Sequence, residues 1–171
     1  MKPLQSAPKP ELSGRRTADR ARRELFLDPY QARRKLKGST VCPKCGAVYH
    51  HGRWQWGQRP DDARAEPCPA CRRIADSLPA GTVTLHGAFA QQHKDEIIGL
   101  ARHEEAAEKG EHPLNRIIAI AETPEGLVID TTDIHLPRRL GEAVKRAFHG
   151  NLAMHFDDAG YFVRVDWRAP G

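Results

Sequence analysis

The chain has 171 residues, a formal net charge of +5 and only 39% hydrophobic residues, with a mean hydropathy of −0.64. No stretch approaches the ~20 consecutive apolar residues that a bilayer span needs, which excludes a membrane-spanning protein. The first 13 residues lack the apolar core of a secretory signal. We therefore expect a cytoplasmic protein, long enough for one ordinary domain and a smaller module.

The positive charge is concentrated in the first 40 residues. This arm carries 11 basic and four acidic side chains, a net charge of +7, so the rest of the chain has a net charge of −2. Dense basic arms commonly bind polyanions, which predicts contact with RNA phosphates; a tail that only aids solubility is the alternative. The arm residues expected to bind RNA are Arg15, Arg16, Arg20, Arg22, Arg23, Arg33, Arg34, Lys35 and Lys37.

Little of this arm is expected to fold by itself. Residues 1–14 are rich in Pro, Ser and Lys and are predicted to be disordered. Two short helices are predicted at 17–27 and 30–36, separated at Pro29, because the residue before a proline avoids the helical region. Neither helix has enough apolar surface to form alone, so residues 1–40 are predicted to be a largely disordered arm.

Four cysteines occur as two matched pairs. Cys42 and Cys45 lie in CPKCG, Cys68 and Cys71 lie in CPAC, and 22 residues separate the pairs. A Cys-x-x-Cys turn points two thiolates at one metal ion, and two such turns complete the tetrahedral Cys₄ site of structural zinc. Disulfides would instead need an oxidising compartment. The spacing predicts one Zn²⁺ ion held by these four cysteines in a zinc ribbon over residues 41–78.

Two histidines in the same segment, His50 and His51, offer a mixed Cys/His site instead. Four thiolates already complete the zinc shell, so we expect these histidines on the surface of a hairpin. A catalytic zinc ion keeps an open coordination position, which four cysteine ligands do not leave. The zinc ion is therefore expected to be structural.

Two tryptophans lie between the cysteine pairs. Trp54 and Trp56 are two residues apart, so on a strand they would share one face. With Arg53 beside them, they could stack on unpaired bases. They could equally cover the metal site, because so small a module has little other core. The sequence leaves both interpretations open, and the first adds Arg53, Trp54 and Trp56 to the RNA-binding residues.

Residues 82–168 have the pattern of an α+β domain. The expected elements are a lone short strand at 82–86, a helix at 91–109, strands at 116–122 and 127–132, a helix from 133–136 to before 150, and strands at 152–156 and 161–167. After the lone strand, the order α-β-β-α-β-β predicts two layers. We expect a four-stranded antiparallel sheet under two helices.

The second helix of this domain is amphipathic. Leu136, Leu140, Val144 and Phe148 fall on one side at 100° per residue, so this side is expected to face the sheet. Basic side chains crowd the opposite side. We add these to the RNA-binding residues: Arg138, Arg139, Lys145 and Arg146.

Catalytic motifs are missing from the sequence, which has no GxSxG, phosphate-cradling glycine loop or HExxH. Asp133 is expected to be the N-cap of the second helix, with His135 in the first turn. A structural role for His135 is the first interpretation and phosphate binding the second; a hydrolase using His135 and Asp133 is a remote alternative. We expect no enzyme and no small-molecule substrate.

The order of these parts resembles one family, the large-ribosomal-subunit export adaptors, also called nonsense-mediated decay protein three. Cys42-Pro43-Lys44-Cys45-Gly46 and Cys68-Pro69-Ala70-Cys71 are similar to two of its knuckles, and residues 116–167 to its following domain. That family usually carries more cysteine pairs and further domains. The resemblance therefore implies a short prokaryotic relative that binds ribosomal RNA or the large subunit.

These observations together predict a non-enzymatic, zinc-binding factor associated with RNA or the ribosome. The arm and the basic helix face would neutralise phosphates. The alternative is a protein–protein interaction module in which zinc is purely structural and RNA plays no part.

Overall fold

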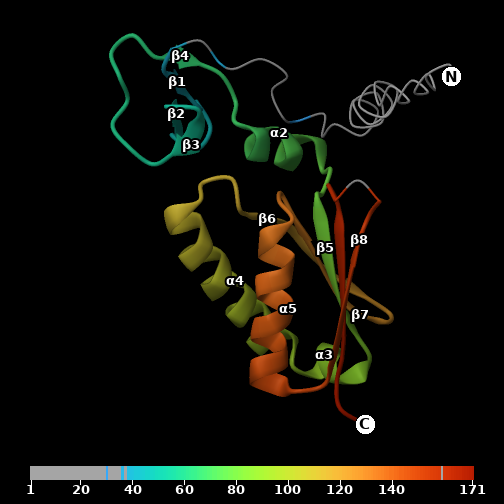
Figure 1. Ribbon diagram of the computed structural model, residues 1–171. Coiled ribbons are helices and arrows are strands. Elements are labelled where there is room, and N and C mark those ends of the chain that lie inside the picture. Colours follow the sequence, from blue (N-terminus) through green and yellow to red (C-terminus); the bar gives the residue numbers. More distant parts are fainter. Residues whose placement is uncertain (1–29, 31–35, 37, 159) are drawn as a thin grey trace, which may run out of the picture.

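The computed structural model describes residues 30, 36, 38–158 and 160–171, and it has two parts (Figure 1). A small sheet with one helix carries the cysteines, and a larger sheet is covered by three helices. The predicted helix at 17–27, and most of the one at 30–36, lie outside the described residues. So do the nine arm residues expected to bind RNA, from Arg15 to Lys37.

The cysteine module, residues 41–78 of the sequence prediction, begins in the structure at Thr40. Its sheet has the order β3-β2-β1-β4, antiparallel except for the parallel pair of β1 and β4. These strands are only two or three residues long. The elements are β1 (Thr40–Val41), β2 (Val48–His50), β3 (Arg53–Gln55), β4 (Arg64–Ala65) and α2 (Pro69–Asp76).

The larger part is an α+β domain, as predicted. Its sheet has the order β6-β7-β5-β9-β8, and its helices lie on one face of that sheet (Figure 1). Both predicted hairpins are present, as β6–β7 and β8–β9. The elements are β5 (Gly81–His86), α3 (Ala88–Gln92), α4 (Lys94–Glu111), β6 (Ile117–Thr123), β7 (Gly126–Thr131), α5 (His135–Phe148), β8 (Asn151–Phe156) and β9 (Val163–Arg168).

Two predictions about this domain are wrong. The strand expected to stand alone, β5, is the centre of the sheet, antiparallel to β7 and parallel to β9. The sheet is therefore five-stranded and mixed, not four-stranded and antiparallel. The helix expected at 91–109 is two helices, α3 and α4, with His93 between them. Val83 and Leu85 on β5 are fully buried, because their side chains lie in the core shared by the sheet and the helices.

The predicted apolar side of α5 does face the sheet. Leu136, Leu140 and Val144 are buried in the core of the domain. Gly141 lets the helix approach closely, since a Cβ atom there would lie 2.6 Å from Cγ1 of Val165 on β9. Basic side chains on the opposite side of α5, such as Arg138 and Lys145, are exposed.

The Asp133 side chain caps the first turn of α5, although the N-cap position itself, expected at Asp133, is occupied by Ile134. Its Oδ2 accepts hydrogen bonds from the backbone N–H groups of His135 (2.7 Å) and Leu136 (3.0 Å). Such a cap satisfies two of the amides that a helix start leaves without intrahelical partners.

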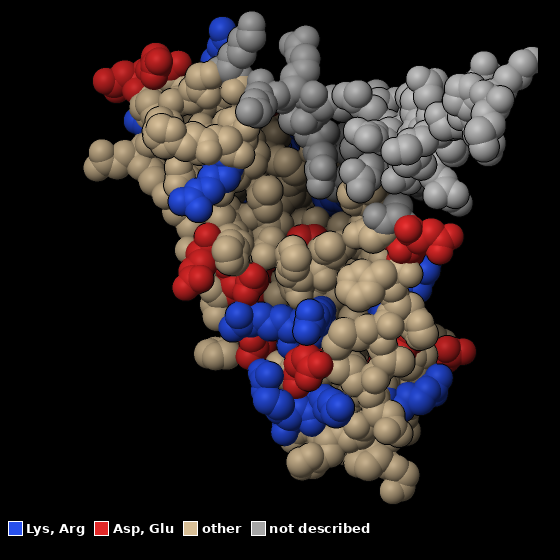
Figure 2. Space-filling view, in the orientation of Figure 1, with Lys and Arg blue, Asp and Glu red and all other residues tan. Residues whose placement is uncertain are grey.

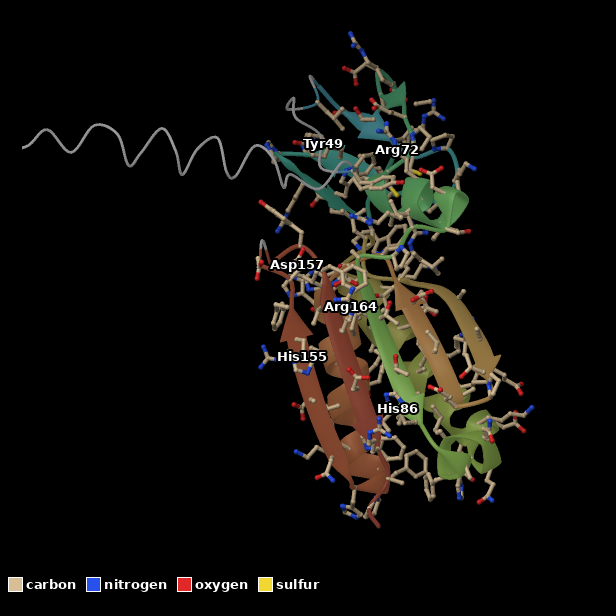
Figure 3. All side chains as sticks on the ribbon, turned by 90° about the vertical axis from the view of Figure 1, so that its right-hand side faces the viewer. Tyr49, Arg72, His86, His155, Asp157 and Arg164 are labelled. Carbon is tan, nitrogen blue, oxygen red and sulfur yellow. The ribbon has the colours of Figure 1, made fainter. Side chains whose placement is uncertain are left out.

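Among the described residues, no helix covers the other face of the sheet, and the side chains on that face have mixed charge. Alternation along the strands places His86, His155 and Arg164 on this face, where Figure 3 shows them. His86 Nε2 lies 2.7 Å from Oδ1 of Asp166 on the neighbouring strand. Arg164 and Asp166 on β9 both lie on this face, so it does not form a uniformly basic surface.

Candidate metal centre

The first cysteine pair lies in the turn between β1 and β2. The backbone N–H of Cys42 donates to the carbonyl of Ala47 at 2.8 Å, and that of Gly46 donates to the carbonyl of Cys42 at 2.9 Å. Gly46 has φ +79°, a left-handed conformation that glycine adopts without steric cost. This tight turn brings the Cys42 and Cys45 side chains to the same side.

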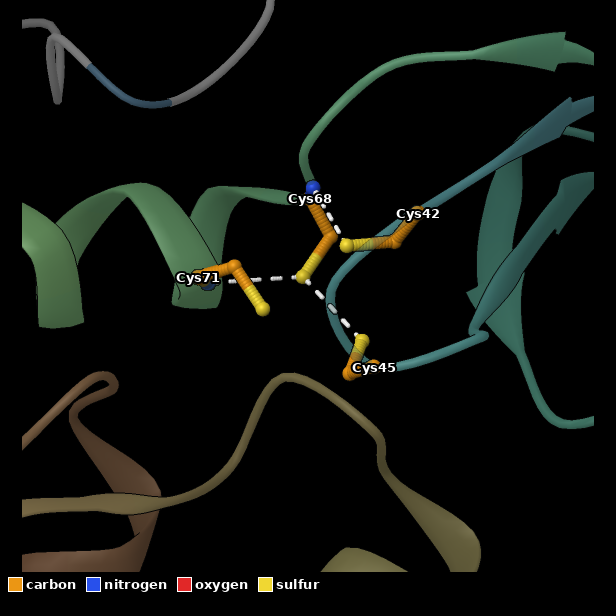
Figure 4. Close-up of side chains that lie close together, drawn as sticks. All are labelled: Cys42, Cys45, Cys68 and Cys71. Atoms are coloured by element: carbon orange, nitrogen blue, oxygen red, sulfur yellow. Dashed lines mark hydrogen bonds between the residues drawn. The ribbon is translucent and has the colours of Figure 1, made fainter.

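The second pair lies at the start of α2. Cys68 is the N-cap residue and Pro69 opens the helix, a position where proline's fixed φ and missing N–H are tolerated. The Cys71 N–H donates to Cys68 Sγ at 3.4 Å, and the Cys68 N–H donates to Cys42 Sγ at 3.3 Å (Figure 4). Backbone amides thus orient sulfurs of both pairs toward one point.

The four sulfurs form the predicted cluster. All of them lie within 4.8 Å of one another, and the Sγ atoms of Cys45 and Cys68 are 3.7 Å apart (Figure 4). Around a tetrahedral zinc ion with Zn–S bonds of about 2.3 Å, sulfurs lie about 3.8 Å from one another. All four cysteines are free of disulfides. The donor set and its spacing therefore fit one tetrahedral metal ion with no open position.

Burial and neighbouring groups alter the acidity of these thiols. Burial, with repulsion from neighbouring thiolates, raises the pKa of Cys68 far above its usual range, and burial also raises the pKa of Cys45. At Cys42 burial acts in the same direction, but backbone N–H groups outweigh it and lower the pKa to about 6. Four adjacent buried thiols do not all ionise unaided. A cation bound between the four sulfurs would supply the charge that makes four thiolates stable.

One residue of this centre, Arg116, was not expected from the sequence. Its Nη2 donates to the Sγ atoms of Cys71 at 3.2 Å and Cys68 at 3.4 Å, although it precedes β6 in the other part of the chain. The residue is 7% exposed. No local pattern in the sequence marks it, because its partners lie 45 and 48 positions away.

Further contacts join the cysteine module to the α+β domain. Leu114, in the loop between α4 and β6, packs against the cysteine core. Trp56 donates from Nε1 to the backbone carbonyl of Lys109, near the end of α4, at 2.6 Å. The metal centre consequently lies against the α4–β6 loop and not on a free module.

The two tryptophans of the module have different environments. Trp54 lies on β3, is half-buried, and packs against the cysteine core. Trp56 follows the end of β3 and is 39% exposed. The expectation that both share one strand face is therefore wrong, because the strand ends at Gln55.

His50 and His51 lie where the sequence predicts. Both are exposed around the turn between β2 and β3. Within the described part of the chain, the only cluster of possible metal ligands consists of the four cysteines.

The basic side of α5 is partly neutralised by α4. Arg139 is 2.6 Å from Glu104 and 2.9 Å from Glu108, and Arg146 lies 3.9 Å from Glu104. Figure 2 shows the resulting mixture of basic and acidic side chains over these helices. The other predicted RNA-binding residues in the described chain, Arg53, Arg138 and Lys145, are exposed.

Asp133 and His135 lie beside a pocket of about 310 Å³ between the two parts of the molecule, lined also by Arg73 and Tyr161. Burial raises the pKa of Asp133, although the helix N–H groups oppose this effect. Its Oδ1 is buried with no hydrogen-bond partner. Its Oδ2 is occupied in capping α5, and the His135 side chain is exposed.

The fold and the site define an α+β protein with a four-cysteine metal centre at the junction of its two parts. No protein-family model matches the chain, and no curated protein matches its sequence. Among the described residues, no helix has the length and apolar character needed to cross a bilayer.

Proposed function

We propose that this protein is a non-enzymatic, zinc-binding factor that associates with RNA, in the setting of the ribosome. The zinc ion is structural: it holds the cysteine module in shape and against the α+β domain. The observation that carries this proposal is the closed tetrahedral set of Cys42, Cys45, Cys68 and Cys71, which leaves no coordination position for a substrate or water.

The RNA half of the proposal rests on the distribution of charge. The described surface mixes both signs, since Arg139 is paired with glutamates and His86 with Asp166. Attraction to a polyanion therefore falls mainly to the arm of residues 1–40, with its net charge of +7. Arg53, Arg138 and Lys145 are exposed cations that extend this contact.

The resemblance to the export adaptors supports a ribosomal partner. The cysteine pairs are followed by an α+β domain, which is the order of parts on which that resemblance stands. The role of Asp133 as a helix cap accounts for this residue without catalysis, which supports a protein that is not an enzyme.

The test is co-sedimentation with ribosomal particles from its own cell, followed by binding of the purified full chain to ribosomal RNA. About six phosphate contacts would weaken binding on the order of 10³-fold between 50 and 200 mM salt. Deleting residues 1–37 should weaken binding and flatten this salt dependence. A truncated chain that binds as tightly, with the same salt dependence, contradicts the RNA proposal.

A protein–protein interaction module is the second candidate. Exposed apolar side chains on the cysteine module favour it: Ile74 on α2 is 37% exposed, and Leu78 just beyond is 47% exposed. Exposed apolar patches often mark contact with other proteins. Replacing Ile74 and Leu78 with Ser would then abolish ribosome association without changing the affinity for naked RNA, which separates the two candidates.

A further inference from the structure

Arg116 is a buried cation that faces sulfur atoms. Both hydrogen bonds of its guanidinium go to cysteine Sγ atoms. None of the ion pairs between described residues involves it. A buried charge is costly unless an opposite charge accompanies it. The nearest source of negative charge is the thiolate cluster.

The backbone of Arg116 is fixed to the sheet of the α+β domain. Its N–H donates to Thr132 Oγ1 at 2.9 Å, and the N–H of Thr132 donates to the Arg116 carbonyl, also at 2.9 Å. Thr132 follows β7 and is itself buried. The guanidinium therefore extends from a fixed point of one part of the molecule to the metal ligands of the other.

We propose that Arg116 is a positioning residue of the metal centre, and that it makes metal binding and docking of the two parts a single coupled event. The proposal rests on the proposed zinc binding. One Zn²⁺ ion with four thiolates carries a net charge of −2, and the guanidinium compensates part of it through two charge-assisted hydrogen bonds. Groups that hold metal ligands in this way commonly alter metal affinity 10- to 100-fold.

Coupling of this kind acts in both directions. If the docked α+β domain strengthens metal binding through Arg116, the bound metal must strengthen docking by the same factor. Without the metal, nothing holds the four sulfurs at the positions that Arg116 Nη2 contacts. Docking of the two parts is then weaker, so the junction opens more readily in the metal-free chain.

The packing of Arg116 supports a role toward the cluster. Its Nε is buried and has no hydrogen-bond partner, an arrangement that costs free energy. The side chain thus leaves one donor unpaired while Nη2 contacts two sulfurs. An arginine that only filled space at the junction would gain nothing from that orientation.

The experiment uses the full chain with Arg116→Met, Arg116→Gln and Arg116→Lys, and with Arg72→Met as the matched control. Arg72 is adjacent to Cys71, but it is exposed and pairs with Glu66 at 2.6 Å. Its replacement therefore removes the same charge beside the centre without removing a contact to sulfur.

Two quantities are measured for each variant: the Kd for zinc by competition with a chelator, and the shift in Tm of the α+β domain when zinc is added. Arg116→Met and Arg116→Gln should weaken zinc binding about 10- to 100-fold and reduce the Tm shift. Arg116→Lys, which keeps the charge, should recover part of the affinity, and Arg72→Met should match the wild type.

A Kd within twofold of the wild type in Arg116→Met, with the full Tm shift, overturns the role of Arg116. If Arg116→Met does not fold, the same measurements on Arg116→Gln decide the question. An Arg116→Lys variant that binds zinc no more tightly than the neutral variants also overturns the role of the charge. A wild-type chain that binds no zinc overturns the proposed metal centre itself, which distinguishes the two failures.

Discussion

The cysteine module and the α+β domain differ greatly in how much apolar surface holds them together. Among the described residues, the core of the α+β domain has 14 buried members, and seven of them, Trp167 included, come from its central strands β5, β7 and β9. The core of the module has five, and three of them are cysteines. Hydrophobic burial can stabilise the first but not the second.

This difference assigns a different source of stability to each part. In the domain, free energy comes from apolar side chains that leave water on folding. In the module, the proposed zinc ion would supply folding energy through its binding energy, and contacts from the domain, through Arg116, Leu114 and Trp56, supplement it. Variants can therefore act on one source of stability at a time.

Removing the metal should have the largest effect, and this effect should be confined to the cysteine module. Cys68→Ser, or a chelator, should unfold residues 40–76 while the α+β domain keeps its helix and sheet signals. Structural zinc supplies on the order of 10 kcal/mol or more in small modules. Amide spectra resolved by residue, with one zinc ion per wild-type chain by elemental analysis, are the measurement. Metal-free protein with four free thiols and a folded module would contradict this prediction.

The converse variant acts on the apolar core alone. Leu85→Ala, at a fully buried position of β5, should lower the free energy of unfolding of the domain by about 2–5 kcal/mol. Zinc should still bind in a 1:1 ratio, because Leu85 lies on the strand far from the metal centre. Denaturant titration measures the change in stability, and metal analysis of the same variant measures its zinc content. Thr84→Ser on the same strand, at a half-exposed position, is the control.

The basic side chains of α5 are of two kinds. Arg138 and Lys145 are exposed and available to a partner, whereas Arg139 forms ion pairs with glutamates of α4. Arg138→Gln with Lys145→Gln should reduce the salt dependence of RNA binding by about one unit of slope for each charge, with unchanged stability. Arg139→Gln should instead lower stability slightly, because Arg139 pairs with Glu104 and Glu108. Equal loss of RNA affinity from both changes would show that the ion pairs of Arg139 with glutamates of α4 do not keep it from contacting RNA.

The smallest effect is expected at the contact between Trp56 and α4. Trp56→Phe removes the hydrogen bond to the Lys109 carbonyl and should cost about 0.5–1.5 kcal/mol of stability. Trp54→Phe keeps that bond and alters only packing on the cysteine core. If docking depends on the bond, hydrogen exchange at the end of α4 rises in the first variant alone. Equal exchange in the two variants would assign docking to the remaining contacts.

Local patterns predicted much of this molecule correctly. Each Cys-x-x-Cys pair forms within one turn, so four thiols at that spacing predict one metal centre wherever the rest of the chain lies. The cap at Asp133 and the apolar side of α5 likewise depend on residues within a few turns of one helix. Contacts between residues so close together in the chain can be predicted from the spacing of residue types.

Other features of the molecule depend on contacts between segments that are far apart in the chain. The central position of β5 depends on pairing with β7 and β9, which lie about 45 and 80 residues further along the chain, and nothing within the strand indicates its neighbours. The same holds for Arg116 at the sulfurs and for Arg139 beside two glutamates of α4. Side chains from distant segments meet only once both parts have folded, so a sequence pattern indicates the metal ligands but not the guanidinium that accompanies them.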